Sequence, residues 1–111
     1  MTPEIIKRET YDVLCDTMGA EFVAELVTTF LDDAPNMFAA LKTAVGAQDI
    51  DAYRRAAHSI KSNAEIFGAV ALAEQARDME LSGLPEGAAP IPALETVFAD
   101  TEAALRPLLD A

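Results

Sequence analysis

Apolar side chains recur every three to four residues along most of this chain, and that spacing limits its possible folds more than any other feature. Phe22, Leu26 and Phe30 stand four residues apart, beside a second apolar row at positions 23, 27 and 31. This spacing predicts an amphipathic helix with a broad apolar stripe. Similar stripes follow at Met37–Val45, Tyr53–Phe67, Leu72–Met79 and Leu94–Leu108. Alanine is abundant and β-branched residues are scattered, so helix is favoured throughout.

Prolines, glycines and capping residues predict where these helices begin and end. The run Asp32-Asp33-Ala34-Pro35 predicts a kink or a restart within the first long stripe. Asp49 is a suitable N-cap for the next helix, and Gly68 is a suitable stop for it. The remaining breaks are expected at Gly46, at Ser82-Gly83, in a long loop over residues 83–92 with three prolines and two glycines, and at Pro107, which should bend or fray the last helix.

The predicted architecture is all-α, with four long amphipathic helices and a short additional N-terminal helix around Ile5–Leu14. Short connections make successive helices antiparallel, so we expect an up-down four-helix bundle. A chain of 111 residues can bury one core, and we expect residues 1–111 to form a single domain. The initial Met1 and the compact ends favour a free-standing protein over a fragment of a larger one.

The charge balance argues against several classes of partner. Nineteen acidic residues against eight basic ones leave a formal net charge of −11. Nucleic acids and anionic lipid surfaces call for a basic surface, so neither is an expected partner. No stretch is long and apolar enough for a signal peptide or a membrane span. The expected location is therefore the cytoplasm.

Sulfur-containing residues offer little chemistry. Cys15 is the only cysteine, which excludes an intramolecular disulfide and a zinc site built from cysteines. We interpret Cys15 as a small hydrophobic residue and expect Met18, Met37 and Met79 to fill the core. No metal site is expected.

His58, the only histidine, has an unusual position. On a helical wheel it lies about 140° from Tyr53, on the polar face. Its neighbours one turn away are Arg54, Arg55, Lys61 and Ser62, so three cations surround it in an acidic chain. One interpretation is an ordinary solvated helix face. The other is a nucleophilic imidazole whose neighbouring cations stabilise an incoming phosphoryl group.

The segment Ala57-His-Ser-Ile-Lys-Ser-Asn-Ala-Glu-Ile-Phe-Gly-Ala69 resembles the signature of histidine-containing phosphotransfer (HPt) domains. The family pattern of histidine, aliphatic residue, lysine, small residue and later glycine falls on His58, Ile60, Lys61, Ser62 and Gly68. The segment Phe22–Pro35 and the run Arg54-Arg55-Ala56-Ala57 are also similar to the family, so the resemblance spans nearly the whole chain.

This resemblance implies that His58 is phosphorylated and that Lys61 and Ser62 act beside it. The family often has glycine at the position of Ser62, where a small residue leaves room over the imidazole; Ser62 could also hydrogen-bond the phosphoryl group. The chain reverses near Gly68, so Glu80 should stand level with His58, where similar proteins hydrogen-bond the imidazole; a solvated glutamate is the alternative. Further phosphate or partner contacts are expected at Arg54, Arg55, Ser59 and Gly68.

The implied activity is that of a phosphocarrier in a two-component phosphorelay, rather than that of a turnover enzyme. The partners would be receiver domains of response regulators or a hybrid sensor histidine kinase, which bring the Mg²⁺; the chain needs no cofactor of its own and is expected to be a monomer. Three alternatives remain. An acyl-carrier-type protein needs an Asp-Ser-Leu-like triplet, which is absent, and a dimerising kinase domain needs an ATP-binding domain, for which no residues remain. A helical adaptor would carry no chemistry.

Overall fold

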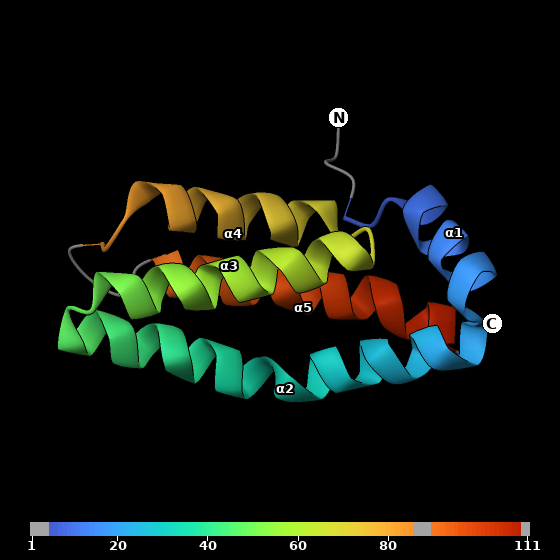
Figure 1. Cartoon of the computed structure of the whole chain (residues 1–111), viewed down its shortest axis with the longest axis horizontal. Helices are drawn as coiled ribbons and strands as arrows, with labels where there is room; N and C mark the ends of the chain where they lie inside the picture. The colour runs from blue at the N-terminus through green and yellow to red at the C-terminus, as the bar shows by residue number, and fades with distance from the viewer. Residues whose placement is uncertain (1–4, 86–89, 110–111) are drawn as a thin grey trace.

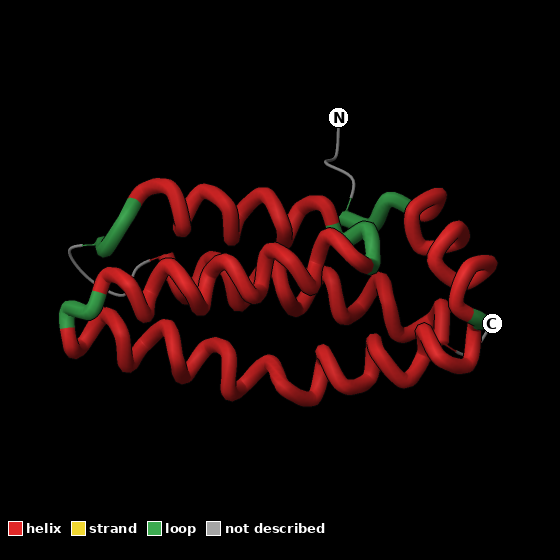
Figure 2. The backbone as a smooth tube through the Cα atoms, viewed as in Figure 1, coloured by secondary structure: helices red, strands yellow, loops and turns green. Residues whose placement is uncertain are grey.

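The computed structural model describes residues 5–85 and 90–109. Over these residues the chain forms five helices and no strand (Figures 1 and 2). The helices are α1 (Arg8–Met18), α2 (Ala20–Ala47), α3 (Ile50–Ile66), α4 (Val70–Ser82) and α5 (Pro90–Leu109). The prediction of an all-α protein with an additional N-terminal helix is confirmed. None of the helices described is long and apolar enough to cross a membrane.

The four long helices close a ring in which neighbours in the sequence are neighbours in space. Helix α3 packs between α2 and α4, and α5 closes the ring by packing against both α4 and α2. Figure 1 shows α2 to α5 running back and forth along one long axis, with α1 set across their end. Among the helices of the described residues, α1 contacts α2 and α3. The centre of the ring is therefore the place where apolar side chains can leave water.

The core follows the predicted apolar stripes closely. The residues expected to face inward on α3 are all buried: Tyr53, Ala57, Ile60, Ala64 and, just past the helix end, Phe67. Four phenylalanine side chains, from α2, the end of α3 and α5, pack against one another in the core. Their ring centroids are 5.6 Å apart for Phe30–Phe67 and Phe30–Phe98 and 5.5 Å apart for Phe38–Phe98. Such tilted or edge-on pairs stabilise a core beyond simple burial of area.

Two apolar residues assigned to the inward face by their spacing or type are exposed instead. Met18 is 44% exposed and Phe22 is 45% exposed, so their assignment to the core was wrong, whereas Met79 is buried as expected. Both lie at the corner between α1 and α2, at the end of the molecule, where few helices are available to cover a side chain.

Several predicted helix boundaries also differ. Of the two outcomes expected at Pro35, a kink or a restart, the restart is absent, because α2 runs without interruption through Pro35 and its ribbon bends along its length (Figure 1). A proline removes one hydrogen bond, and burial of the apolar stripes on both sides of it favours one continuous helix. Helix α1 starts and ends later than expected. Helix α5 begins at Pro90 inside the predicted loop, because proline is well tolerated in a first turn; residues 86–89 of that loop lie outside the described residues. Helix α5 continues past Pro107 to Leu109.

Helix α3, which carries His58, is held at both ends. At its start, the Asp49 carboxylate accepts a hydrogen bond of 3.1 Å from the backbone N–H of Ala52, as predicted for an N-cap. Just past its end, Gly68 adopts a positive φ of 74°. A side-chain Cβ at Gly68 would stand only 2.7 Å from the carbonyl oxygen of Lys7, so only glycine fits the close approach of the N-terminal segment.

Candidate functional site

His58 lies on the outer face of α3, as its place on the helical wheel predicted. Its side chain is 56% exposed, whereas Ala57 and Ile60 beside it in the sequence are fully buried. The imidazole is therefore carried by a helix whose opposite face is buried, and it remains open to solvent. This location excludes a role for His58 as a core-filling residue.

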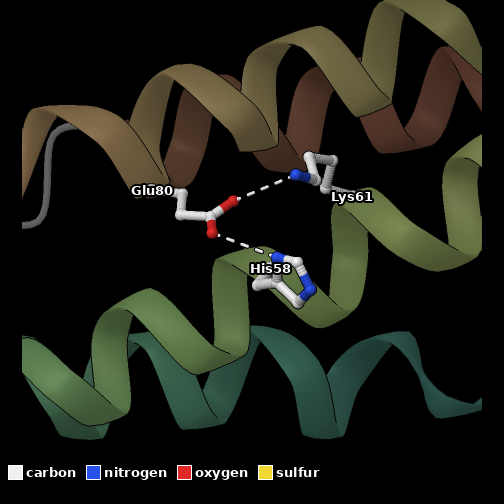
Figure 3. A network of polar contacts seen from close by, with 3 residues as sticks. All are labelled: His58, Lys61 and Glu80. Carbon is white, nitrogen blue, oxygen red and sulfur yellow. Dashed lines mark hydrogen bonds and ion pairs between the residues drawn. The ribbon is translucent and has the colours of Figure 1, made fainter.

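The first partner of the imidazole is Glu80, which reaches it from α4. The ring Nδ1 of His58 and Oε1 of Glu80 are 3.0 Å apart (Figure 3). Helices α3 and α4 are antiparallel neighbours joined at Gly68, so residues at similar distances from that turn meet. Glu80 therefore lies at the same height along the helices as His58, as predicted. The role of the contact in transfer remains a prediction.

The second oxygen of the same carboxylate faces Lys61. The Nζ of Lys61 lies 3.4 Å from Oε2 of Glu80, and the two side chains are 21% and 24% exposed. The Oε2 atom is buried and accepts no hydrogen bond from the described residues, so the ion pair is what offsets its charge. Lys61 stands three residues after His58, which places both side chains on the side of α3 that faces α4 (Figure 3).

The environment of Glu80 favours its ionised form. Burial disfavours a charged carboxylate, but the hydrogen bond from His58 and the charge of Lys61 outweigh it, and the pKa of Glu80 is lowered from its ordinary value. An ionised carboxylate can only accept hydrogen bonds. In the neutral imidazole, Nδ1 must therefore carry the proton that is donated to Glu80, which leaves the lone pair of Nε2 free.

The two arginines before His58 do not join this cluster. The Arg55 Nε donates a 3.4 Å hydrogen bond to the backbone carbonyl of Asp51, one turn back along α3. The Arg54 guanidinium lies against Gly83, 3.7 Å from where a Cβ on that glycine would stand. Of the three cations that the sequence places around His58, only Lys61 contacts Glu80, the carboxylate that binds the imidazole.

The other predicted site residues occupy different surroundings. Ser62 is half-buried one turn beyond His58, and Ser59 is exposed beside it. Gly68 is buried at the far end of α3, about 15 Å along the helix axis from His58. Its expected contact with phosphate or partner does not fit this position, because its close neighbour is the backbone of Lys7.

One feature of the site escaped the sequence reasoning. A groove of about 400 Å³ lies between α2 and α3 beside Ser59, and its polar lining includes Asp33, Asn36 and Asn63. The Asn63 amide folds back to donate a 3.0 Å hydrogen bond to the carbonyl of Ser59. The signal was present in the four-residue spacing of Ser59 and Asn63, but the side of α2 that faces them follows only from the packing.

Comparison with known proteins adds the family. Within the part of the chain that the structure describes, no group of three or more His, Cys, Asp or Glu side chains could hold a metal ion. No curated protein and no solved structure matches the chain significantly. The family model described as Hpt domain matches residues 25–107, which span the whole of α3 and α4 and most of α2 and α5. The chain therefore belongs to the Hpt domain family, whose members are phosphocarrier modules, not turnover enzymes, of two-component phosphorelays.

Proposed function

We propose that this protein receives a phosphoryl group on Nε2 of His58 from a phosphorylated receiver-domain aspartate and passes it to another receiver aspartate. The observation that carries this proposal is the orientation of the imidazole. Glu80 occupies Nδ1 at 3.0 Å, so the nucleophilic lone pair is on Nε2, on a side chain that is more than half exposed.

The chemistry exchanges one high-energy bond for another. The Nε2 lone pair attacks phosphorus, the Nε2–P bond forms, and the bond between phosphorus and the aspartyl oxygen breaks with its electrons left on that carboxylate. The receiver would supply the Mg²⁺, whose charge would offset that of the phosphoryl oxygens. The similar energies of the two phosphorylated forms allow the phosphoryl group to move in either direction.

Two side chains of this protein would assist from nearby. Lys61 contacts the same carboxylate as His58, and its ammonium would stabilise the charge of the phosphoryl oxygens. Ser62 lies one turn after His58, and its small side chain would leave room above the imidazole for the phosphoryl group. Ser59 and the groove between α2 and α3 offer a surface against which a receiver can be positioned. Arg54 and Arg55 would act on the partner rather than on the phosphoryl group.

The bundle topology and the setting belong to the same proposal. Helices α2 to α5 form an antiparallel up-down bundle, an inference supported by their closed ring of contacts and by their alternating directions in Figure 1. We infer a monomer that works in the cytoplasm with receiver domains of response regulators or of a hybrid sensor kinase.

A transfer assay tests this function. The full chain is mixed with Mg²⁺ and each of a panel of receivers carrying radiolabelled aspartyl phosphate. At least one receiver should pass its label to this chain, in a bond that is labile to acid and stable to base, on the peptide that contains His58. If no receiver of the source organism transfers label, or the label lies on another residue, the proposal is wrong.

A further inference from the structure

The contact between His58 and Glu80 has a different meaning once Nε2 carries a phosphoryl group. An imidazole substituted on Nε2 is neutral when Nδ1 has no proton, and it is a cation when Nδ1 keeps its proton. Attack by the neutral ring, with its proton already on Nδ1, produces the cation directly. The Glu80 carboxylate, 3.0 Å from Nδ1, would then form a charge-assisted hydrogen bond to that cation.

Whether Nδ1 keeps its proton decides how easily the phosphoryl group leaves. When the Nε2–P bond breaks, its electron pair stays on Nε2. With Nδ1 protonated, the departing group is neutral imidazole, a good leaving group. With Nδ1 unprotonated, the departing group would be the imidazolate anion, a poor one. Water or a receiver carboxylate supplies the oxygen that forms the new bond to phosphorus.

We infer that Glu80 sets the lifetime of phosphorylated His58 by holding the Nδ1 proton in place, so that the phosphoryl group remains transferable at neutral and mildly alkaline pH. This inference rests on the proposed function. It makes Glu80 a positioning residue that keeps a proton on the leaving group, in addition to selecting the nitrogen that attacks. The lowered pKa of Glu80 supports it, because the carboxylate stays charged over the whole working range of pH.

The surrounding charges are compatible with this role. On α3 the charged side chains closest to His58 in sequence are Arg54, Arg55 and Lys61, and on α4 those closest to Glu80 are Arg77 and Asp78. On α2, Asp33 lines the groove that Ser59 also lines, whereas Asp78 lines a hollow beside Tyr53. Arg55 and Arg54 are directed to Asp51 and Gly83, and Arg77 lines a separate hollow with Glu65. Glu80 is the one carboxylate in contact with the ring among the described residues, and Lys61 limits its pull by neutralising its other oxygen.

The test measures hydrolysis of the phosphorylated full chain without any receiver. Wild type, Glu80→Gln and Glu74→Gln are loaded with phosphoramidate, a small-molecule phosphoryl donor, and loss of phosphate is followed from pH 5 to pH 9. Glu74→Gln is the matched control, because Glu74 is exposed on the same helix and its substitution removes the same charge. Loading by phosphoramidate requires no partner, so this test can fail while the receiver assay succeeds, and the reverse.

Glu80→Gln should move the pH at which hydrolysis slows downward by about one unit, because an opposite charge in contact favours the protonated ring. At pH 8 its phosphorylated form should last about three to ten times longer than that of wild type, and at pH 5 the two should converge. Glu74→Gln should behave as wild type. The same substitution also frees the charge of Lys61, and an effect of that charge alone would appear as the same change of rate at every pH in this range.

A second measurement needs no variant. Nitrogen NMR of ¹⁵N-histidine-labelled, phosphorylated wild type should show Nδ1 still protonated at a pH where the same chain in urea has lost that proton. Equal lifetimes of wild type and Glu80→Gln across the pH range would overturn the inference. So would a uniform offset between them, or identical Nδ1 titration in folded and unfolded chains.

Discussion

The inner and outer faces of α3 differ in how far the rest of the protein encloses their side chains. On the inner face, Tyr53, Ala57 and Ile60 have no exposed surface and belong to the hydrophobic core. On the outer face, the described partners of His58 reduce to one carboxylate on α4. A single helix thus carries a face on which stability depends and another on which the chemistry depends. Substitutions should separate the two properties cleanly.

His58→Gln provides the largest effect on the outer face. Phosphorylation should be abolished, because glutamine has no nucleophilic nitrogen. The free energy of unfolding should change by less than about 1 kcal/mol, since an exposed side chain leaves no cavity. The transfer assay and urea denaturation measure the two quantities. A variant that still accepts label, or one that unfolds far more easily, would contradict the division between the faces.

Ile60→Ala makes the opposite change, two residues away on the inner face. Ile60 is fully buried, so truncation should cost about 2–5 kcal/mol of unfolding free energy through lost burial and a residual cavity. Transfer per folded molecule should stay near the wild-type rate. Ile50→Ala is the control, because Ile50 is 38% exposed on the same helix and should lose much less stability. A small stability loss at Ile60 together with a large loss of transfer would refute the comparison.

Lys61→Ala sharpens the comparison within the outer face. Loss of its ammonium should slow transfer by a factor on the order of 10 to 1000, because the charge acts on the phosphoryl group in the transition state. Binding of the receiver should be retained. Lys42→Ala controls for net charge, since Lys42 pairs with Glu95 between α2 and α5, 3.7 Å away. The transfer rate is measured by rapid-quench kinetics at saturating receiver. An unchanged rate for Lys61→Ala would show that Lys61 does not act on the phosphoryl group.

Ser62 distinguishes space from charge above the imidazole. Ser62→Arg should slow transfer by roughly two orders of magnitude, because bulk one turn from His58 displaces the reacting atoms. Ser62→Gly should leave transfer nearly unchanged and cost at most about 1 kcal/mol of helix stability. Both rates are measured from one phosphorylated receiver. Faster transfer by Ser62→Arg would mean that added positive charge outweighs crowding at this position.

Local patterns were sufficient to predict the helices, the inner face of α3 and the level of Glu80. Each depends on helical periodicity and on one short turn at Gly68, and both are local properties. The sequence left open whether Pro35 kinks the helix or restarts it, because the local cost of a proline does not show how packing on both sides of it favours one continuous helix. The contacts of the Arg54 and Arg55 side chains were also not predicted. Each long side chain can reach several neighbouring atoms, and the sequence does not show which one it contacts. The link from Lys61 to Glu80 needed the position of α4 in space.

Gly68 shows how a signature can combine two kinds of requirement. Its backbone carbonyl accepts a 2.7 Å hydrogen bond from the N–H of Lys7, and its missing side chain admits the carbonyl of the same residue. A library of variants selected only for signalling output would reject substitutions at Gly68 and at His58 alike. The two losses would have different remedies: a stabilising change elsewhere could restore a Gly68 variant, whereas no second change of that kind could restore a missing imidazole.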